Sequence, residues 1–344
     1  MFANYARLAT TFALGLILVR LLVVLGDDVY GLTVLLGAGV GFAAILRDVA
    51  QASLVPSLSA AFHHSEVGFR RMYHSANVVA LGCAALSWLA FLGLSWQVEG
   101  LNVPPELLPA AKWFVWTKAA QVTVGVLMAP ACTMVLVREW MVFHNATAVL
   151  DRSTDVIAAA GICLMPSMPA ADAVWWYGTL TAGLSIAFTL GTSAGTWLRD
   201  PRLRFGCRYA TWAGIRGVIA SSLSITLFLV SMCLYVRFDN FVMNHHLALA
   251  GNLVFGIAVQ LTAYVRQMSQ GLIIGMDAVA ARLKSQGARE ASLALLERST
   301  RIQAAIVFPT TIIVLAFADE LVRVWVGSRL PSPQTLIPHI AAAS

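Results

Sequence analysis

The chain has 344 residues, of which 59% are hydrophobic and only 12% are charged, and its mean hydropathy is +0.76. A soluble domain has about a quarter charged residues and could not cover so much apolar surface, so the composition excludes a water-soluble fold. The net charge of +6 comes from basic residues in short connecting segments, which argues against a nucleic-acid-binding face. The five cysteines form no CxxC pair, so we expect neither a disulfide framework nor a metal site.

Nine apolar stretches are long enough to cross the hydrocarbon core as helices, which takes about 20 residues with some latitude for tilt. In lipid each backbone polar group needs a partner within its own helix, so the stretches predict an all-α integral membrane protein with about nine transmembrane helices. The expected spans are Leu8–Leu25, Tyr30–Leu46, Ser75–Trp96, Phe114–Val137, Val156–Ala170, Val174–Trp197, Val218–Val236, Leu247–Val265 and Ile302–Val326.

The distribution of basic residues predicts the orientation. With a cytoplasmic N-terminus, most of the 23 lysines and arginines, including Arg47 and Arg152, fall in segments on the cytoplasmic side. Because these residues accumulate in short cytoplasmic loops, we predict a multi-pass protein of the inner cell membrane with its N-terminus inside.

A weak internal repeat predicts the domain organisation. The segment Pro56–His64, between the second and third spans, is echoed by Asp277–Ser285, between the eighth and ninth. A displacement of six helices on one side of the membrane is typical of two parallel lobes related by an axis along the membrane normal. We therefore expect a first six-helix lobe over residues 1–198, a basic cytoplasmic linker over 199–217 and a partial second lobe over 218–344.

Three motifs carry a family resemblance: Leu25–Leu32, the glycine-rich second span that leads to Arg47 and Asp48, and Val324–Gly327. Together they resemble the Wzx-type polysaccharide-biosynthesis flippases of the multidrug/oligosaccharidyl-lipid/polysaccharide (MOP) exporter superfamily. The resemblance implies two six-helix lobes around a central cavity and transfer of an undecaprenyl-diphosphate-linked oligosaccharide to the outer leaflet.

The resemblance also sets the expected partners and a departure from the family pattern. The partners are membrane lipid, a lipid-diphosphate-linked glycan and glycan-assembly proteins, with no cofactor and no nucleic acid. With nine spans the second lobe is half missing, so we expect either a fragment of a longer gene product or a chain that needs a partner to complete the cavity.

Three basic residues inside or beside the spans are candidates for binding the substrate. Ionisable groups in a span are costly and mark functional sites, so Arg20, Lys118 and Arg237 could line a cationic cavity for a lipid diphosphate. The alternative is that each side chain extends its charged head to the outer interface, and that Arg237 pairs with Asp239.

Two carboxylates are candidates for coupling transport to an ion. Asp151 and Asp155 are four residues apart, which places both on one face of a helix at the cytoplasmic start of the fifth span. They could carry a proton or a sodium ion. The alternative is a solvated helix start, where acidic side chains suit the helix dipole.

Gly37 and Gly41 in the second span have the GxxxG spacing that allows helix backbones to approach closely. We expect helix packing there, with a hinge between lobes as the alternative. The remaining functional alternatives are a cation-coupled multidrug exporter of the same superfamily, a membrane-embedded enzyme of glycan assembly and a scaffold for such enzymes. An enzyme is disfavoured because the outer loops are short and hold few charged residues.

Overall fold

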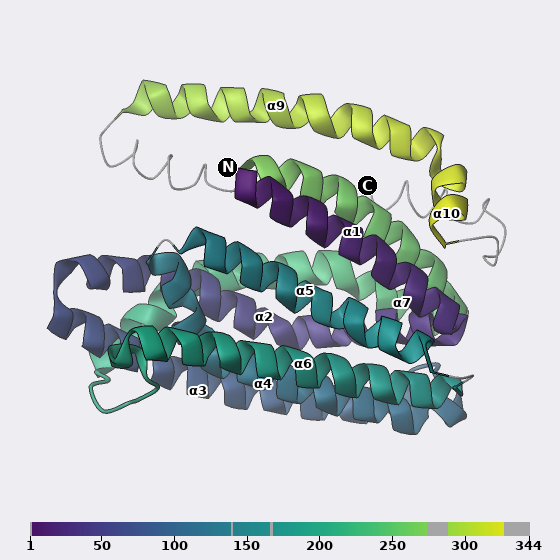
Figure 1. Cartoon of the computed structure of the whole chain (residues 1–344), viewed down its shortest axis with the longest axis horizontal. Helices are drawn as coiled ribbons and strands as arrows, with labels where there is room; N and C mark the ends of the chain where they lie inside the picture. Colours follow the sequence, from purple (N-terminus) through teal and green to yellow (C-terminus); the bar gives the residue numbers. More distant parts are fainter. Residues whose placement is uncertain (1, 139, 166–167, 274–287, 327–344) are drawn as a thin grey trace.

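The structure, a computed structural model, describes residues 2–138, 140–165, 168–273 and 288–326. Within these residues every regular element is a helix, as the apolar composition predicts, and the long helices lie side by side along the molecule (Figure 1). The elements are α1 (Phe2–Leu25), α2 (Asp27–His64), α3 (Glu66–Gln97), η1 (Val98–Gly100), η2 (Pro105–Leu107), α4 (Leu108–Val137), α5 (Met141–Cys163), α6 (Ala170–Arg199), η3 (Pro201–Leu203), α7 (Trp212–Ile273), α9 (Arg289–Ala316) and α10 (Ala318–Val326).

Four helical stretches of the described chain are both long and apolar enough to cross a membrane. They are Glu66–Gly100, Pro105–Val137, Phe238–Val265 and Arg289–Ala316, and a shorter apolar stretch covers Ala9–Leu25. Helices α2 and α5 are also long, but each carries charged residues in its interior, which lowers its mean hydropathy.

Two short turns define the two ends of the bundle. Gly26 joins α1 to α2. Its φ is 142°, a backbone conformation that residues other than glycine rarely adopt. Ser65 joins α2 to α3, and its hydroxyl accepts a hydrogen bond of 3.1 Å from the backbone N–H of Gly68, which caps α3. The end at Gly26 is the predicted outer end, and the end at Ser65 is the predicted cytoplasmic end.

The seventh and eighth predicted spans lie on two segments of α7 that meet at Ala248. This residue has φ of 53° and ψ of −152°, and it is the one non-glycine residue with positive φ in the described chain. Such a conformation costs roughly 1–3 kcal/mol and persists where the surrounding structure imposes it. The ninth span covers the end of α9 and all of α10, which are separated at Phe317.

The fifth span is displaced from its predicted position. It was expected at Val156–Ala170, but α5 is Met141–Cys163, and Pro169 instead precedes the first residue of α6. The prediction excluded Asp151 and Asp155 because charged side chains are costly in lipid. In the fold both lie in the middle of α5, so the expectation of a cytoplasmic helix start for them is wrong.

Helix α2 also extends past charged residues at which the predicted span stopped. The second span was expected to end at Leu46, whereas α2 continues past Arg47 to His64. Arg47 and Arg152 therefore lie within helices and not in the loops between them. The orientation itself remains a prediction, as does the division into two lobes.

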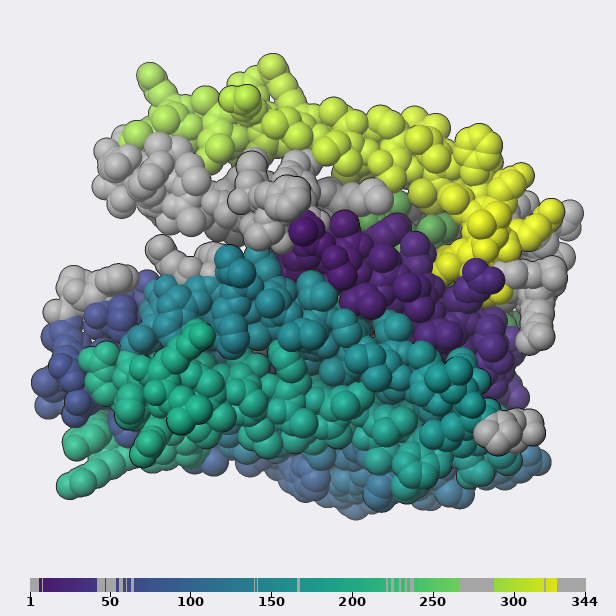
Figure 2. Space-filling model, in the orientation of Figure 1, coloured from purple at the N-terminus to yellow at the C-terminus, as the bar shows by residue number. Residues whose placement is uncertain are grey.

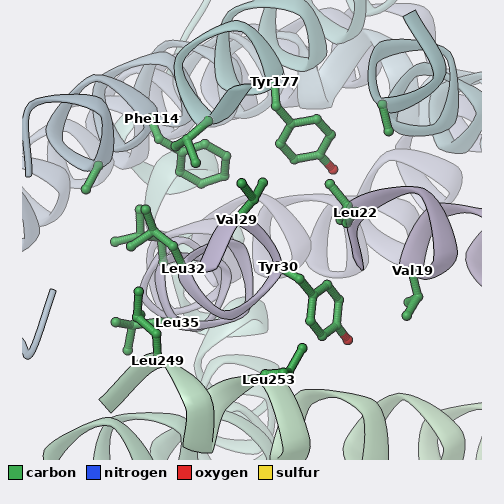
Figure 3. Close-up of a cluster of buried hydrophobic side chains, with 14 of the residues drawn as sticks. Val19, Leu22, Val29, Tyr30, Leu32, Leu35, Phe114, Tyr177, Leu249 and Leu253 are labelled. Atoms are coloured by element: carbon green, nitrogen blue, oxygen red, sulfur yellow. The ribbon is translucent and has the colours of Figure 1, made fainter. Parts of the chain in front are cut away.

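Helix α2 is the centre of the main hydrophobic core. In Figure 3 its Val29 faces Phe114 of α4, while its Leu35 lies beside Leu249 of α7. Tyr30 lies beside Leu253 of α7 in the same view. One helix of the first predicted lobe thus packs simultaneously on its own lobe and on α7.

Helix α9 lies along the outside of this core. No described residue of α9 is buried, and in Figure 2 it runs along the edge of the molecule, with α10 at one end. The indole N–H of Trp325 in α10 donates a 2.9 Å hydrogen bond to the backbone carbonyl of Leu16, which ties α10 to α1. The second copy of the predicted repeat, Asp277–Ser285, lies outside the described residues.

The connector between α6 and α7, residues 200–211, is held against α3. The Tyr73 hydroxyl donates a 2.5 Å hydrogen bond to the Leu203 carbonyl, and the Asn77 amide donates one of 2.9 Å to the Gly206 carbonyl. Ser75 exchanges hydrogen bonds with the Thr211 backbone at 3.1 and 3.4 Å. These three residues of α3 are at most 1% exposed. Because their hydrogen bonds are shielded from water, they hold the backbone of the connector in one conformation.

Asp200 joins the connector to the end of α4. It forms an ion pair with Arg138, and it accepts hydrogen bonds of 2.9 Å from two nitrogens of the Arg202 guanidinium. Burial alone would raise the pKa of Asp200, but the hydrogen bonds from Arg202 and the charges of Arg138 and Arg202 outweigh it and hold the pKa below its usual value.

Replacing this carboxylate should destabilise the fold. Asp200→Asn leaves Arg138 without its partner in a largely buried site, and breaking a buried pair costs on the order of 3 kcal/mol. We expect a drop of several degrees in the apparent Tm of the purified protein. Because the folded pKa is depressed, the stabilisation is present at neutral pH and is lost as the pH falls through the folded value.

Glu66→Gln is the matched control, because Glu66 pairs with Arg70 and Arg202 at the surface. An exposed pair contributes about 0–1 kcal/mol, so its Tm should change little. Equal losses for the two variants would show that burial of Asp200 has no effect on stability.

Candidate functional site

A cavity of about 480 Å³ lies between the first helices and the second segment of α7. Helices α1, α2, α4, α5, α6 and α7 all contribute to its wall. Its polar and charged lining is concentrated on α2, α4 and α5, whereas α1 contributes apolar side chains. The polar and charged residues are Tyr30, Thr33, Arg47, Lys118, Gln121, Arg152, Asp155, Tyr177, Asn240 and Gln260.

Lys118 is anchored in the wall of this cavity. It lies ten residues into α4, about 15 Å from the Gly26 end at 1.5 Å per residue. Its ammonium group donates hydrogen bonds of 2.9 Å to the side chains of Gln121 and Thr181 and lies 5.5 Å from the centre of the Phe114 ring. The charge is thus held in place by neutral partners, and no carboxylate contacts it directly among the described residues.

The charged residues of α5 are divided between two cavities. Arg152 forms an ion pair of 3.3 Å with Asp155, and both line the cavity of 480 Å³. Asp151 accepts a 3.0 Å hydrogen bond from the Ser185 hydroxyl of α6. It lines a second cavity of about 220 Å³ between α2, α4, α5 and α6, together with His144 and Thr189.

Arg47 belongs to both cavities. A Cβ atom at Gly125 would lie 2.9 Å from the Cδ atom of Arg47, so the glycine of α4 makes room for the aliphatic part of this arginine. Arg47 and Gln121 line both spaces and form the boundary between them. Four charged side chains are close enough to the Lys118 ammonium to interact with it electrostatically. They are Asp155, Asp151, Arg47 and Arg152.

The larger cavity has an excess of positive charge. Three cationic side chains, Lys118, Arg47 and Arg152, face a single carboxylate, Asp155. Charges interact more strongly in a low-dielectric interior than in water, so this excess favours an anionic group over a cationic one. Guanidinium groups in particular bind phosphate oxygens through two parallel hydrogen bonds.

The structure separates the three predicted cationic candidates. Lys118 lines the cavity, whereas the Arg20 side chain is exposed on the outside of α1. The side chain of Arg237 lies outside the described residues. Sequence reasoning assigned Arg47 and Arg152 to cytoplasmic loops and missed them as cavity residues. The feature that could have identified Arg47 and Arg152 is an acidic residue nearby in the sequence and close to an apolar run. These acidic residues are Asp48, Asp151 and Asp155.

The structure tests the predicted glycine packing at one of its two positions. A Cβ atom at Gly37 would meet nothing within 4 Å, and Gly37 faces the cavity. Close approach occurs instead at Gly39, where a Cβ would lie 2.8 Å from Leu94 of α3, and at Gly31, where it would lie 2.6 Å from the Leu249 carbonyl of α7. The packing at Gly41 stays a prediction. In the described part of the chain no three His, Cys, Asp or Glu side chains gather as a metal site.

At the Gly26 end, α7 contacts the loop between α3 and α4. The backbone N–H of Asn102 in this loop donates a 3.1 Å hydrogen bond to the side chain of Asn244, and its amide donates to the carbonyls of Asn244 and His245 at 3.1 Å each. In the cavity wall, a Cβ at Gly256 would lie 2.7 Å from Val34 of α2. Close contacts therefore join α7 to the first half of the chain on this side of the cavity.

Comparison with known proteins places the fold. No protein-family model and no curated protein matches the sequence. The structure is similar to a multidrug resistance MATE family transporter of the MOP superfamily in its inward-facing conformation, with a TM-score of 0.69 and 15% identity over 97% of this chain and 75% of the other. For an outward-facing MATE family transporter the TM-score is 0.57, with 15% identity over 98% of this chain and 77% of the other.

A third similar structure is a MOP superfamily transporter from Pyrococcus furiosus, with a TM-score of 0.63 and 14% identity over 99% of this chain and 77% of the other. Reverse polarity of the binding pocket suggests a different function for that protein. The chain therefore has the fold of the MATE transporters of the MOP superfamily.

Proposed function

We propose that the chain moves a lipid-linked oligosaccharide or polysaccharide precursor across the inner membrane by alternating access. The cavity would hold the diphosphate and sugar head while the lipid tail stays in the bilayer. The observation that carries the proposal is the charge of the cavity, in which Lys118, Arg47 and Arg152 outnumber Asp155. A lipid diphosphate is an anionic group that such a set can bind by charge-assisted hydrogen bonds.

The arrangement of the helices supports alternating access. Gly31 and Val34 of α2, and Asn102 of the loop between α3 and α4, contact α7 toward the Gly26 end, so these elements must separate if the cavity is to open there. The greater similarity to an inward-facing transporter than to an outward-facing one agrees with closure at this end. With the predicted cytoplasmic N-terminus, the structure corresponds to a state that is closed to the outside.

Asp151 and Asp155 are the proposed coupling residues. Both lie in the middle of α5, and Asp151 also faces the smaller cavity beside the hydroxyls of Ser185 and Thr147. Carboxylate and hydroxyl oxygens can carry a proton or bind a sodium ion. A proton or sodium ion bound to either carboxylate would increase the net positive charge of the cavities. Binding of the ion would therefore strengthen binding of an anionic substrate.

A cation-coupled multidrug exporter of the same superfamily is the second candidate. The same two mid-helix carboxylates favour it, because they could instead neutralise a cationic drug. The two candidates differ in the sign of the preferred substrate. A membrane-embedded enzyme of glycan assembly, or a scaffold for such enzymes, remains the alternative if the purified protein moves neither class of compound.

Removing the central cation should slow transport of the anionic substrate. Lys118→Gln deletes a charge that has neutral hydrogen-bond partners, so little else should rearrange. The loss of a charge-assisted hydrogen bond, about 1.5 kcal/mol or more, corresponds to a tenfold or greater fall in rate. The measurement is translocation of a fluorescent lipid-diphosphate-linked sugar in liposomes that contain the purified protein.

Lys112→Gln is the control on the same helix. Lys112 pairs with Glu99 at the surface and lies outside the cavity, so its substitution should leave the rate unchanged. Equal rates for the Lys118 and Lys112 variants would contradict the assigned binding site. Faster transport of a cationic dye than of the lipid-linked sugar by the unmodified protein would favour the exporter.

Neutralising the carboxylates of α5 should uncouple transport from an ion gradient. In Asp151→Asn and Asp155→Asn, a proton or sodium gradient should no longer accelerate translocation, while equilibration without a gradient continues. Asp172→Asn, at the exposed start of α6, serves as the control and should keep the acceleration. Full acceleration in the Asp151/Asp155 double variant would exclude coupling through α5.

A further inference from the structure

The connector between α6 and α7 presents basic and aromatic side chains to the surroundings at the Ser65 end. Arg204 and Arg208 are exposed on it, and Arg216 is exposed on the first turns of α7. In the described residues none of these three arginines forms an ion pair with a carboxylate, in contrast to Arg202, which binds Asp200 and Glu66. Unneutralised positive charge is therefore concentrated on one short segment.

Large aromatic side chains alternate with these arginines. Phe205 is 39% exposed, Tyr209 is 46% exposed and Trp212 is 75% exposed. The Arg208 guanidinium carbon lies 5.8 Å from the centre of the Tyr209 ring. Tryptophan and tyrosine are enriched where membrane meets water, because one part of the ring is apolar and the other is polar.

The position of the segment places it at the membrane surface. It begins directly after the last residue of α6 and leads into the first turns of α7, and both helices belong to the bundle of long helices. Residues at such helix ends lie at the depth of the lipid headgroups. The exposed aromatic rings can enter the boundary between headgroups and acyl chains while the arginines remain beside the phosphates.

The segment is also held in a fixed shape. Tyr73, Ser75 and Asn77 of α3 bind backbone atoms of the connector, so its backbone need not be ordered when a ligand binds. A prearranged surface loses less conformational entropy on binding than a flexible basic loop would. This distinguishes the connector from an ordinary charged linker.

From the charge, the aromatic side chains and the fixed backbone we infer that the connector is a docking surface for anionic phospholipid headgroups, bound by Arg204, Arg208 and Arg216. The occupant is a membrane phospholipid and not the transported substrate, because these residues lie outside both cavities. With the predicted orientation the lipid belongs to the inner leaflet. Binding there would hold one end of α6 and α7 at the membrane surface while other helices move.

The test measures lipid binding to the purified full chain by native mass spectrometry. Phosphatidylglycerol and phosphatidylcholine with identical acyl chains are titrated separately. We expect preferential binding of phosphatidylglycerol, and a tenfold or greater loss of its affinity in the triple variant Arg204→Gln, Arg208→Gln, Arg216→Gln. Each arginine near an anionic surface contributes on the order of fivefold in affinity.

Two further variants make the result specific. Replacing the same three arginines by lysine should retain most of the preference, because the charge is kept. Replacing Arg289, Arg298 and Arg323 by glutamine removes the same charge from exposed positions of α9 and α10 and should leave the preference intact. The contacts of Tyr73, Ser75 and Asn77 are unchanged in every variant, so an unaltered Tm checks the fold.

Three outcomes would overturn the inference. Equal affinity for the two lipids would exclude headgroup recognition. Equal losses in the two glutamine triple variants would indicate a general effect of net charge. Displacement of phosphatidylglycerol by inorganic phosphate, but not by chloride at the same ionic strength, would assign the surface to a free anion instead of a lipid.

Discussion

The cost of placing charge inside a membrane protein governs this structure. Lys118, Arg47, Arg152, Asp151 and Asp155 all lie in the interior of long helices, where contact with lipid would be strongly unfavourable. The fold meets this cost by turning all five toward two adjoining cavities, where they have one another, Gln121, Thr181 and Ser185 as neighbours. The polar cavity and the packing of the helices around it are therefore two aspects of one arrangement.

Helix α2 connects this arrangement to the movement that the proposed transport requires. One part of its surface carries Arg47 and lines both cavities, while Gly31 and Val34 contact α7 closely. A displacement of α7 relative to α2 would alter the cavity wall and the closure at Asn102 together. The connector held by Tyr73, Ser75 and Asn77 fixes the beginning of α7 to α3, so the freedom for such a displacement must come from elsewhere along α7.

The sequence predicted the class of fold well, because hydropathy reports directly which segments can lie in lipid. The errors at Arg47 and Asp155 have one physical cause. The second predicted span ended before Arg47 and the fifth began after Asp155, since a single chain read residue by residue gives no sign of the cavity that makes these charges tolerable there. Lys118 was identified because it interrupts an otherwise apolar span, but Arg20 gives the same local signal and lies on the outside of α1. The contacts of Asn102 with Asn244 and of the connector with α3 join residues more than a hundred positions apart, and no local pattern predicts them.

The sign of the charge in the larger cavity can be measured without knowing the substrate. Gly37 lines this cavity with open space beside its Cα, so Gly37→Cys in a chain whose five native cysteines are replaced by serine places a thiol there. The protein in lipid nanodiscs is treated with negatively and positively charged methanethiosulfonate reagents. The rate at which each reagent modifies the introduced thiol is divided by the rate at which the same reagent modifies a small free thiol in solution. We expect a clear preference for the negative reagent, because three cationic side chains and one carboxylate line the cavity; a preference for the positive reagent would contradict this charge.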